Sequence, residues 1–225
     1  MLKSVLIVAG GNGKRMSANM PKQFLPLNEE PVLMHTIRAF YNYERGIKIF
    51  VALNSEWHFY WQQLCAELQF TIPHILTEGG SNRFESVKNG LTHISNEGLI
   101  AIHDGARPLV SKELISKCFS EARIYGNATP AVPVGDSMRE INGLDNHAVD
   151  RAKFAFIQTP QVFWAEIIKL AYEINYNPAF TDDASVVESQ GLAIKLIPGD
   201  PRNIKITWPD DLRIAQLLLA EVQNS

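Results

Sequence analysis

The chain has 225 residues, and 46% of them are hydrophobic, which is enough to bury one substantial core in a single domain. The formal net charge of −3 lacks the basic excess on which non-specific nucleic-acid binding depends, so no nucleic-acid partner is expected. Cys65 and Cys118 form no metal-binding or redox spacing, and we interpret both as buried thiols in a reducing cytoplasm.

Predicted strands and helices alternate along the chain. The first apolar run, 2–9, is too short to span a membrane and no signal-peptide cleavage site follows it, which favours a first strand in a cytoplasmic protein. Apolar β-rich runs predict strands at 5–8, 47–53, 99–102, 131–134 and 194–197. Helical periodicity predicts helices at 32–43, 57–68, 83–93, 112–125, 164–174 and 210–221. This alternation is typical of an α/β fold with a mainly parallel sheet and helices on both faces.

A glycine-rich loop, 9–16, follows the first predicted strand. Glycines let backbone N–H groups surround phosphate oxygens without a Cβ clash, so the loop indicates a nucleotide ligand. A glycine-rich turn with two solvated cations is the alternative for the loop alone. Met16 replaces the third glycine of the dinucleotide fingerprint, and Arg15 stands where a P-loop needs Ser or Thr. Neither common phosphate-binding motif therefore fits.

Three cations, Lys14, Arg15 and Lys22, gather in and beside this loop. Such a cluster suits a triphosphate. In nucleotidyl transfer the protein mainly positions the reactants and stabilises charge on the phosphoryl oxygens. Cations that reach the α-phosphate are therefore the expected catalysts, and no covalent nucleophile is needed.

Acidic residues later in the chain leave two interpretations open. Asp104 follows the predicted strand 99–102, and open α/β sheets bind ligands at the carboxyl ends of their strands. Asp-Gly is also a common turn pair, so a ligand role does not follow from this context alone. Asp182 and Asp183 follow Thr181 at a predicted helix start, where capping is expected for at least one of the three.

The segment 135–156 departs from the alternation of strands and helices. It carries Gly143, Asp145 and Asn146 between polar flanks, which predicts a hairpin or an arm that projects from the domain.

Eight blocks, in order along nearly the whole chain, carry a resemblance to a known family: 9–16, 21–23, 79–87, 103–108, 148–151, 158–161, 181–185 and 203–207. Together they resemble the 2-C-methyl-D-erythritol 4-phosphate cytidylyltransferases of the non-mevalonate isoprenoid pathway. The resemblance implies one Rossmann-like nucleotidyltransferase domain, 1–225. It also implies transfer of the cytidylyl group of CTP to 2-C-methyl-D-erythritol 4-phosphate. The loop alone also resembles ribitol 5-phosphate cytidylyltransferases, and a nucleotide-binding regulator without turnover is the alternative from another class.

The resemblance also implies roles for individual residues. The nucleotide would contact Ala9, Gly10, Gly11, Gly13, Gly80 and Ser86. Arg15 and Lys22 would stabilise the transition state, while Arg151 and Lys205 would position the acceptor phosphate. Hydroxyl groups around the acceptor would come from Ser137, Thr159 and Thr181.

Mg²⁺ is the implied cofactor, and the implied assembly is a homodimer. Asp104 matches the family's acidic residue near the magnesium and the acceptor hydroxyls, but we assign no metal ligand. The arm at about 135–156 resembles the family's dimerising arm, which implies that Arg151 acts in the active site of the other subunit. His103 is interpreted as structural.

Overall fold

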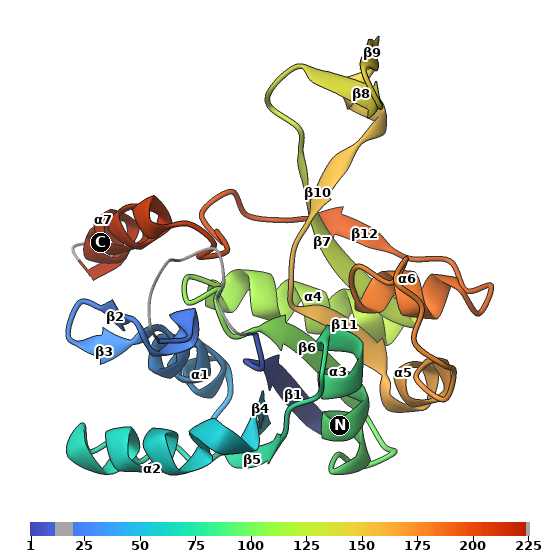
Figure 1. Cartoon of the computed structure of the whole chain (residues 1–225). Helices are drawn as coiled ribbons and strands as arrows, with labels where there is room; N and C mark the ends of the chain where they lie inside the picture. The colour runs from blue at the N-terminus through green and yellow to red at the C-terminus, as the bar shows by residue number, and fades with distance from the viewer. Residues whose placement is uncertain (12–19, 224–225) are drawn as a thin grey trace.

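The first apolar run forms β1 (Lys3–Val8), an inner strand of a parallel group. In this computed structural model, which describes residues 1–11 and 20–223, eight strands form one sheet (Figure 1). β1 pairs in parallel with β4 (Lys48–Leu53) and β6 (Leu99–Asp104), and β4 pairs in parallel with β5 (Ile75–Glu78). These strands are largely apolar because helices cover both of their faces.

Beyond β6 the sheet becomes mixed. β11 (Gln161–Trp164) runs antiparallel to both β6 and β7 (Asn127–Pro133), and lies between them. β7 also pairs with β10 (Ala155–Ile157) in antiparallel and with β12 (Leu196–Pro198) in parallel. The predicted α/β fold is confirmed, and its parallel character belongs to the core strands.

The helices lie in two layers. One layer packs on the sheet face that carries Val5 and Ile7, and it contains α1 (Val32–Tyr43), α2 (His58–Glu67) and α4 (Lys112–Tyr125). The other packs on the face that carries Leu6, and it contains α3 (Arg83–Thr92), α5 (Ala165–Ala171) and α6 (Asp183–Glu188). α7 (Pro209–Gln223) packs beside the small β2–β3 sheet (Pro26–Leu27 and Glu30–Pro31). Among the described residues, no helix has the length and apolarity that a membrane crossing needs.

The predicted arm is present and rises from the body at the top of Figure 1. Its tip is a hairpin of β8 (Met138–Asn142) and β9 (Asp145–Val149), which turns at Gly143 with a φ of 62°. A short 3₁₀ helix, η4 (Arg151–Lys153), leads from β9 towards β10. The arm exposes large apolar side chains, namely Ile141, Leu144, Phe154 and Phe156.

Both predicted thiols lie inside the helices that were expected to carry them. Cys118 on α4 is fully buried, whereas Cys65 on α2 is half-buried. Burial raises the pKa of Cys65 to about 11 and that of Cys118 to about 12, so both are protonated thiols at neutral pH.

Candidate active site

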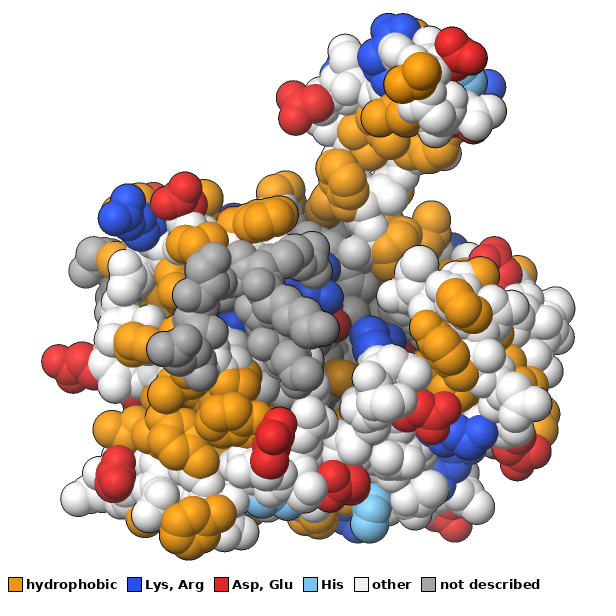
Figure 2. Space-filling model, in the orientation of Figure 1, with side chains coloured by type: hydrophobic (Ala, Val, Ile, Leu, Met, Phe, Trp, Pro, Cys, Tyr) orange, Lys and Arg blue, Asp and Glu red, His pale blue; other side chains and the backbone are white. Residues whose placement is uncertain are grey.

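A pocket of about 540 Å³, called the first pocket below, opens at the carboxyl ends of the parallel strands. Residues 9–11 continue β1 into it, Asn54 follows β4, and Asp104 ends β6. Figure 2 shows Lys and Arg side chains in the hollow at the centre of this face. The position is the edge at which open α/β sheets bind their ligands.

The loop before α3 closes one side of the first pocket. Ser86 accepts a hydrogen bond of 2.9 Å from the Gly80 N–H and donates one of 2.8 Å to the Asn82 carbonyl. A Cβ on Gly80 would lie 2.3 Å from the Cβ of Glu85, so this close approach requires glycine. The predicted nucleotide residues Ala9, Gly10, Gly11, Gly80 and Ser86 all line the first pocket. Gly13 lies outside the described residues.

Lys22 lines the first pocket from a 3₁₀ turn, η2 (Lys22–Phe24). The turn is fixed by its neighbours, because Gln23 donates a 2.5 Å hydrogen bond to the Ala9 carbonyl and Phe24 is buried against aromatic rings. The Lys22 Nζ donates to the Ile206 carbonyl at 2.8 Å. The chain therefore holds one predicted cation at the nucleotide loop. The other two cations, Lys14 and Arg15, lie outside the described residues.

A second pocket of about 250 Å³ adjoins the first, and the two share Arg83, Asp104 and Lys205. The remaining lining residues are Arg107, Ile157, Gln158, Thr159, Gln161, Thr181 and Asp182. The predicted acceptor residues Thr159, Thr181 and Lys205 are thus brought together at this second pocket. The shared residues make the two pockets one continuous site.

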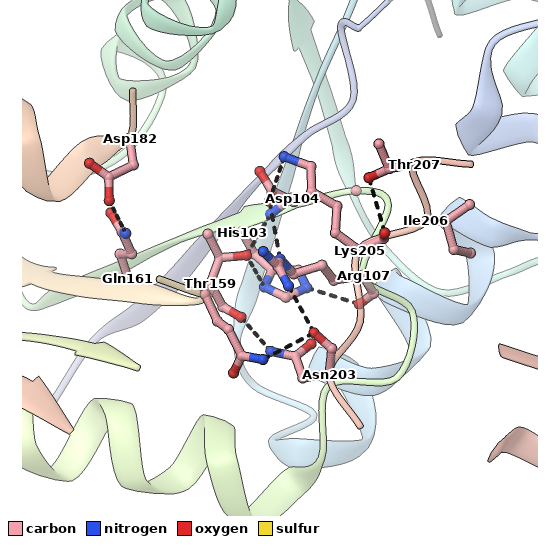
Figure 3. Close-up of polar contacts among 12 residues, drawn as sticks. His103, Asp104, Arg107, Thr159, Gln161, Asp182, Asn203, Lys205, Ile206 and Thr207 are labelled. Carbon is pink, nitrogen blue, oxygen red and sulfur yellow. Dashed lines mark hydrogen bonds and ion pairs between the residues drawn. The ribbon is translucent and has the colours of Figure 1, made fainter. Parts of the chain in front are cut away.

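Asp104 is the charged centre of the site, and Figure 3 shows it with two of its partners, Lys205 and Arg107. Its Oδ2 lies 3.0 Å from the Lys205 Nζ and 3.2 Å from the Arg107 Nε, and its Oδ1 lies 3.7 Å from the Arg83 Nε. Burial alone would raise the pKa of Asp104, but the attraction of Lys205, Arg83 and Arg107 outweighs it and holds the pKa well below its ordinary range. The carboxylate is therefore ionised at neutral pH.

Lys205 reaches Asp104 because the segment that carries it lies beside the end of β6. The Ile206 N–H donates to the Ala106 carbonyl at 2.9 Å, and the Ile206 side chain is fully buried. The segment 203–207 forms no strand of its own. The ion pair joins residues about a hundred positions apart, so sequence periodicity does not predict it.

His103 holds the polar scaffold behind Asp104. Its Nε2 donates to the Arg107 carbonyl at 3.1 Å, so its Nδ1 accepts the Thr159 hydroxyl proton at 3.0 Å. The Thr159 Oγ1 in turn accepts the Asp104 N–H at 3.0 Å. Burial lowers the pKa of His103, so the imidazole is neutral at neutral pH. A neutral ring bonded only within the chain agrees with the interpretation of His103 as structural. The Thr159 hydroxyl already has two partners within the chain.

Acidification should destabilise the protein through His103. Burial lowers the pKa of His103 from 6.5 to about 4. Between these values the unfolded chain binds more protons than the folded chain, so the free energy of unfolding should fall by about 3 kcal/mol as the pH is lowered across this window. Urea unfolding curves at a series of pH values measure this dependence. The non-titrating variant His103→Gln should show a shallower slope, and equal slopes would contradict the assignment.

Two predicted acceptor residues are not brought to either pocket. Ser137 and Arg151 are exposed on the arm, and the Nη1 of Arg151 donates to the Gly135 carbonyl. Arg151 instead lines a hollow of about 410 Å³ at the base of the arm, beside residues of β7.

Several residues that line the site were not predicted from the sequence, above all Asn54, Arg83, Arg107 and Gln161. Arg83 carried a signal, because the helix dipole disfavours a cation at the first position of a helix and such a residue needs a local anion. Asp183 is that anion. The predicted capping role falls on Asp182, whose side chain accepts the Ser185 N–H at 2.9 Å in a capping box.

The donor set of the site also tests whether a magnesium ion fits. Among the described residues, no group of three or more His, Cys, Asp or Glu side chains could hold a metal ion. Asp104 is the carboxylate that the described chain places in the first pocket. Mg²⁺ is commonly bound by one or two carboxylates together with substrate phosphates and water, so the residues fit an ion that arrives with a nucleotide.

Comparisons with known proteins show which family the chain belongs to. The family model IspD, 2-C-methyl-D-erythritol 4-phosphate cytidylyltransferase, matches residues 3–221. A relative of that name from Bacteroides fragilis is 45% identical over 219 residues, covering 97% of this chain and 100% of the relative. One from Azobacteroides pseudotrichonymphae is 49% identical over 218 residues, covering 96% and 98%. A crystal structure of the enzyme of that name from Thermus thermophilus has a TM-score of 0.78 and 31% identity, covering 97% of this chain and 98% of that chain.

Proposed function

The chain belongs to the IspD family of 2-C-methyl-D-erythritol 4-phosphate cytidylyltransferases, and we propose that its two adjoining pockets hold the nucleotide and the acceptor of that reaction. It transfers the cytidylyl group of CTP to 2-C-methyl-D-erythritol 4-phosphate, a step of isoprenoid precursor biosynthesis. The products are 4-diphosphocytidyl-2-C-methyl-D-erythritol and pyrophosphate. The observation that carries the assignment of the pockets is their shared wall of Arg83, Asp104 and Lys205, where the two substrates would meet.

The transfer forms one bond and breaks one. An oxygen of the acceptor phosphate attacks the α-phosphorus of CTP, and the bond from that phosphorus to the pyrophosphate oxygen breaks. No general base is needed, because a phosphate dianion already carries its nucleophilic lone pair. Lys22, together with Arg15, stabilises the charge that grows on the α-phosphate oxygens. Lys205 aims the acceptor phosphate by a charge-assisted contact.

A divalent cation belongs to this proposal as the companion of CTP. Magnesium would be held chiefly by the phosphate oxygens, with Asp104 as the adjacent protein carboxylate. When bound, it would neutralise part of the negative charge of the triphosphate. Arg83, Arg107 and Lys205 keep Asp104 ionised and in place for that role.

The arm is proposed to join two copies of the chain into a cytoplasmic homodimer. Its exposed apolar side chains need a partner surface, and a twofold arrangement would cover both arms at once. Ser137 and Arg151 are exposed on the arm, outside the two pockets of their own chain. These placements support a site completed by the partner subunit's Arg151.

Pyrophosphate release from CTP tests the proposed function directly. Turnover is expected with 2-C-methyl-D-erythritol 4-phosphate and not with ribitol 5-phosphate. Turnover with ribitol 5-phosphate and not with 2-C-methyl-D-erythritol 4-phosphate would show that the chain is a ribitol 5-phosphate cytidylyltransferase. CTP binding without turnover on either acceptor would instead indicate a nucleotide-binding regulator.

CTP should be strongly preferred over UTP, ATP and GTP. The Ser86 hydroxyl bonds to the backbone at Gly80 and at Asn82, and so fixes the loop that lines the first pocket. A fixed arrangement of donors and acceptors discriminates between bases whose own donors and acceptors differ. Initial rates with each nucleotide at a fixed acceptor concentration measure the preference. Equal turnover with all four would remove the argument for base recognition.

A further inference from the structure

Arg83 occupies an unusual position at the junction of the two pockets. It is the first residue of α3, directly after the N-cap Asn82, where the helix dipole opposes a positive charge. Its side chain lines both pockets and is 27% exposed. The helix dipole destabilises a positive charge at this position, so a nearby anion must compensate for it. A role of the arginine in the site would explain why the position carries a cation.

The compensating anion is Asp183, the first residue of α6, whose side chain is fully buried. The Arg83 Nη1 and Nη2 donate to its two carboxylate oxygens at 2.8 and 2.5 Å, which is a bidentate pair. The Tyr172 hydroxyl donates to the same carboxylate at 2.7 Å from the end of α5. Three elements thereby fix the plane and direction of one guanidinium group.

The pairing leaves donors of Arg83 unused by Asp183. A guanidinium has five N–H groups, and the bidentate pair takes one from each terminal nitrogen. The Nε faces the Asp104 Oδ1 at 3.7 Å, which is an ion-pair distance and too long for a hydrogen bond. Buried ion pairs add little stability compared with apolar side chains, so stability alone does not explain this one. The ion pair with Asp183 instead holds the Arg83 guanidinium group in one orientation where the two pockets meet.

We propose that Arg83 is a further catalytic cation of the transfer, which contacts the two reacting phosphates, and that Asp183 and Tyr172 are the positioning residues that aim it. This inference rests on the proposed function. Contacts of this kind strengthen as charge moves between the phosphates, so they act on kcat more than on either KM.

A charge-neutral double variant, Arg83→Gln with Asp183→Asn, tests the inference, because it leaves no uncompensated buried charge. It should fold, as judged by its thermal unfolding, and its kcat should fall about 100-fold, which is typical for the loss of one preorganised donor. Tyr172→Phe, which leaves both charges in place, should lower kcat by about three- to tenfold through one lost hydrogen bond. Lys88 is a cation of the same helix, but its side chain lines neither pocket. The kcat of Lys88→Gln should therefore match that of the wild type.

The outcomes separate this inference from the function on which it rests. A wild-type protein that releases no pyrophosphate from CTP with 2-C-methyl-D-erythritol 4-phosphate would overturn the proposed function. An active wild type, together with a folded double variant whose kcat stays within about twofold of it, would overturn the role of Arg83 alone. If the double variant fails to fold, an unchanged kcat in Tyr172→Phe would likewise overturn the role of Arg83.

Discussion

Replacing Lys22 by alanine is expected to lower kcat by about 10²- to 10³-fold, as the loss of one preorganised donor to a developing oxyanion typically does. Lys22 lines the first pocket, and its 3₁₀ turn is held by Gln23 and Phe24. The ammonium group is therefore in place before the reaction, and no reorganisation is needed as charge builds on the α-phosphate. Steady-state kinetics with both substrates near saturation measure the effect.

The matched control for this variant is Lys117→Ala, which removes an exposed lysine from α4 on the outside of the molecule. Its kcat should equal that of the wild type. Both variants should unfold near the wild-type temperature, because neither side chain belongs to the core. A Lys22→Ala enzyme with unchanged kcat and a raised KM for CTP would show that Lys22 binds only the ground state.

Mixing two inactive variants should restore about a quarter of the wild-type activity if subunits share their sites. In the proposed dimer each site combines Lys22 of one chain with the partner subunit's Arg151, so Lys22→Ala and Arg151→Ala should each be nearly inactive alone. When the two are unfolded and refolded together in equal amounts, about half of the dimers should be mixed. Each mixed dimer has one intact site and one site with both defects.

The arm itself supplies the control for this experiment. Arg139 is another exposed arginine of the arm, and it contacts Asn146 within the hairpin. Arg139→Ala should keep its activity without mixing. If Arg151 served its own chain, no mixture would contain an intact site and the activity would stay at the level of the separate variants. That result would refute the shared site and leave cytidylyl transfer standing.

Local signals explain which parts of the fold could be predicted. The predicted bounds of α4 agree with the structure because Ser111 caps its start and Gly126, with a φ of 90°, ends it. β11 was not predicted. It has four residues, and so short an apolar run does not distinguish a strand from the start of the helix that follows. Its antiparallel position between β6 and β7 depends on tertiary contacts, which no local sequence pattern predicts.

The residues of the site also divide into those that local sequence signals predict and those that depend on contacts between distant segments. The glycine loop and Lys22 could be found from their neighbours in the sequence, because phosphate binding needs glycines and cations close together. Lys205 was identified through the family resemblance alone, since its partner Asp104 is remote in the chain. Arg83 and Asp183 pair across a hundred residues, because the fold brings the first residue of α6 to the first residue of α3, and no local sequence pattern predicts that contact. The predicted role of Arg151 stays a prediction.

The dispersed origin of the two pockets has a consequence for refolding kinetics. Their walls come from segments that begin at Val8 and end at Thr207. Helices form within microseconds, whereas contacts between distant segments must first overcome the entropy of closing long loops. Far-UV circular dichroism should therefore recover before CTP turnover does when the denatured chain is refolded. Enzymatic activity is in this sense a probe of the last folding event rather than of any single element.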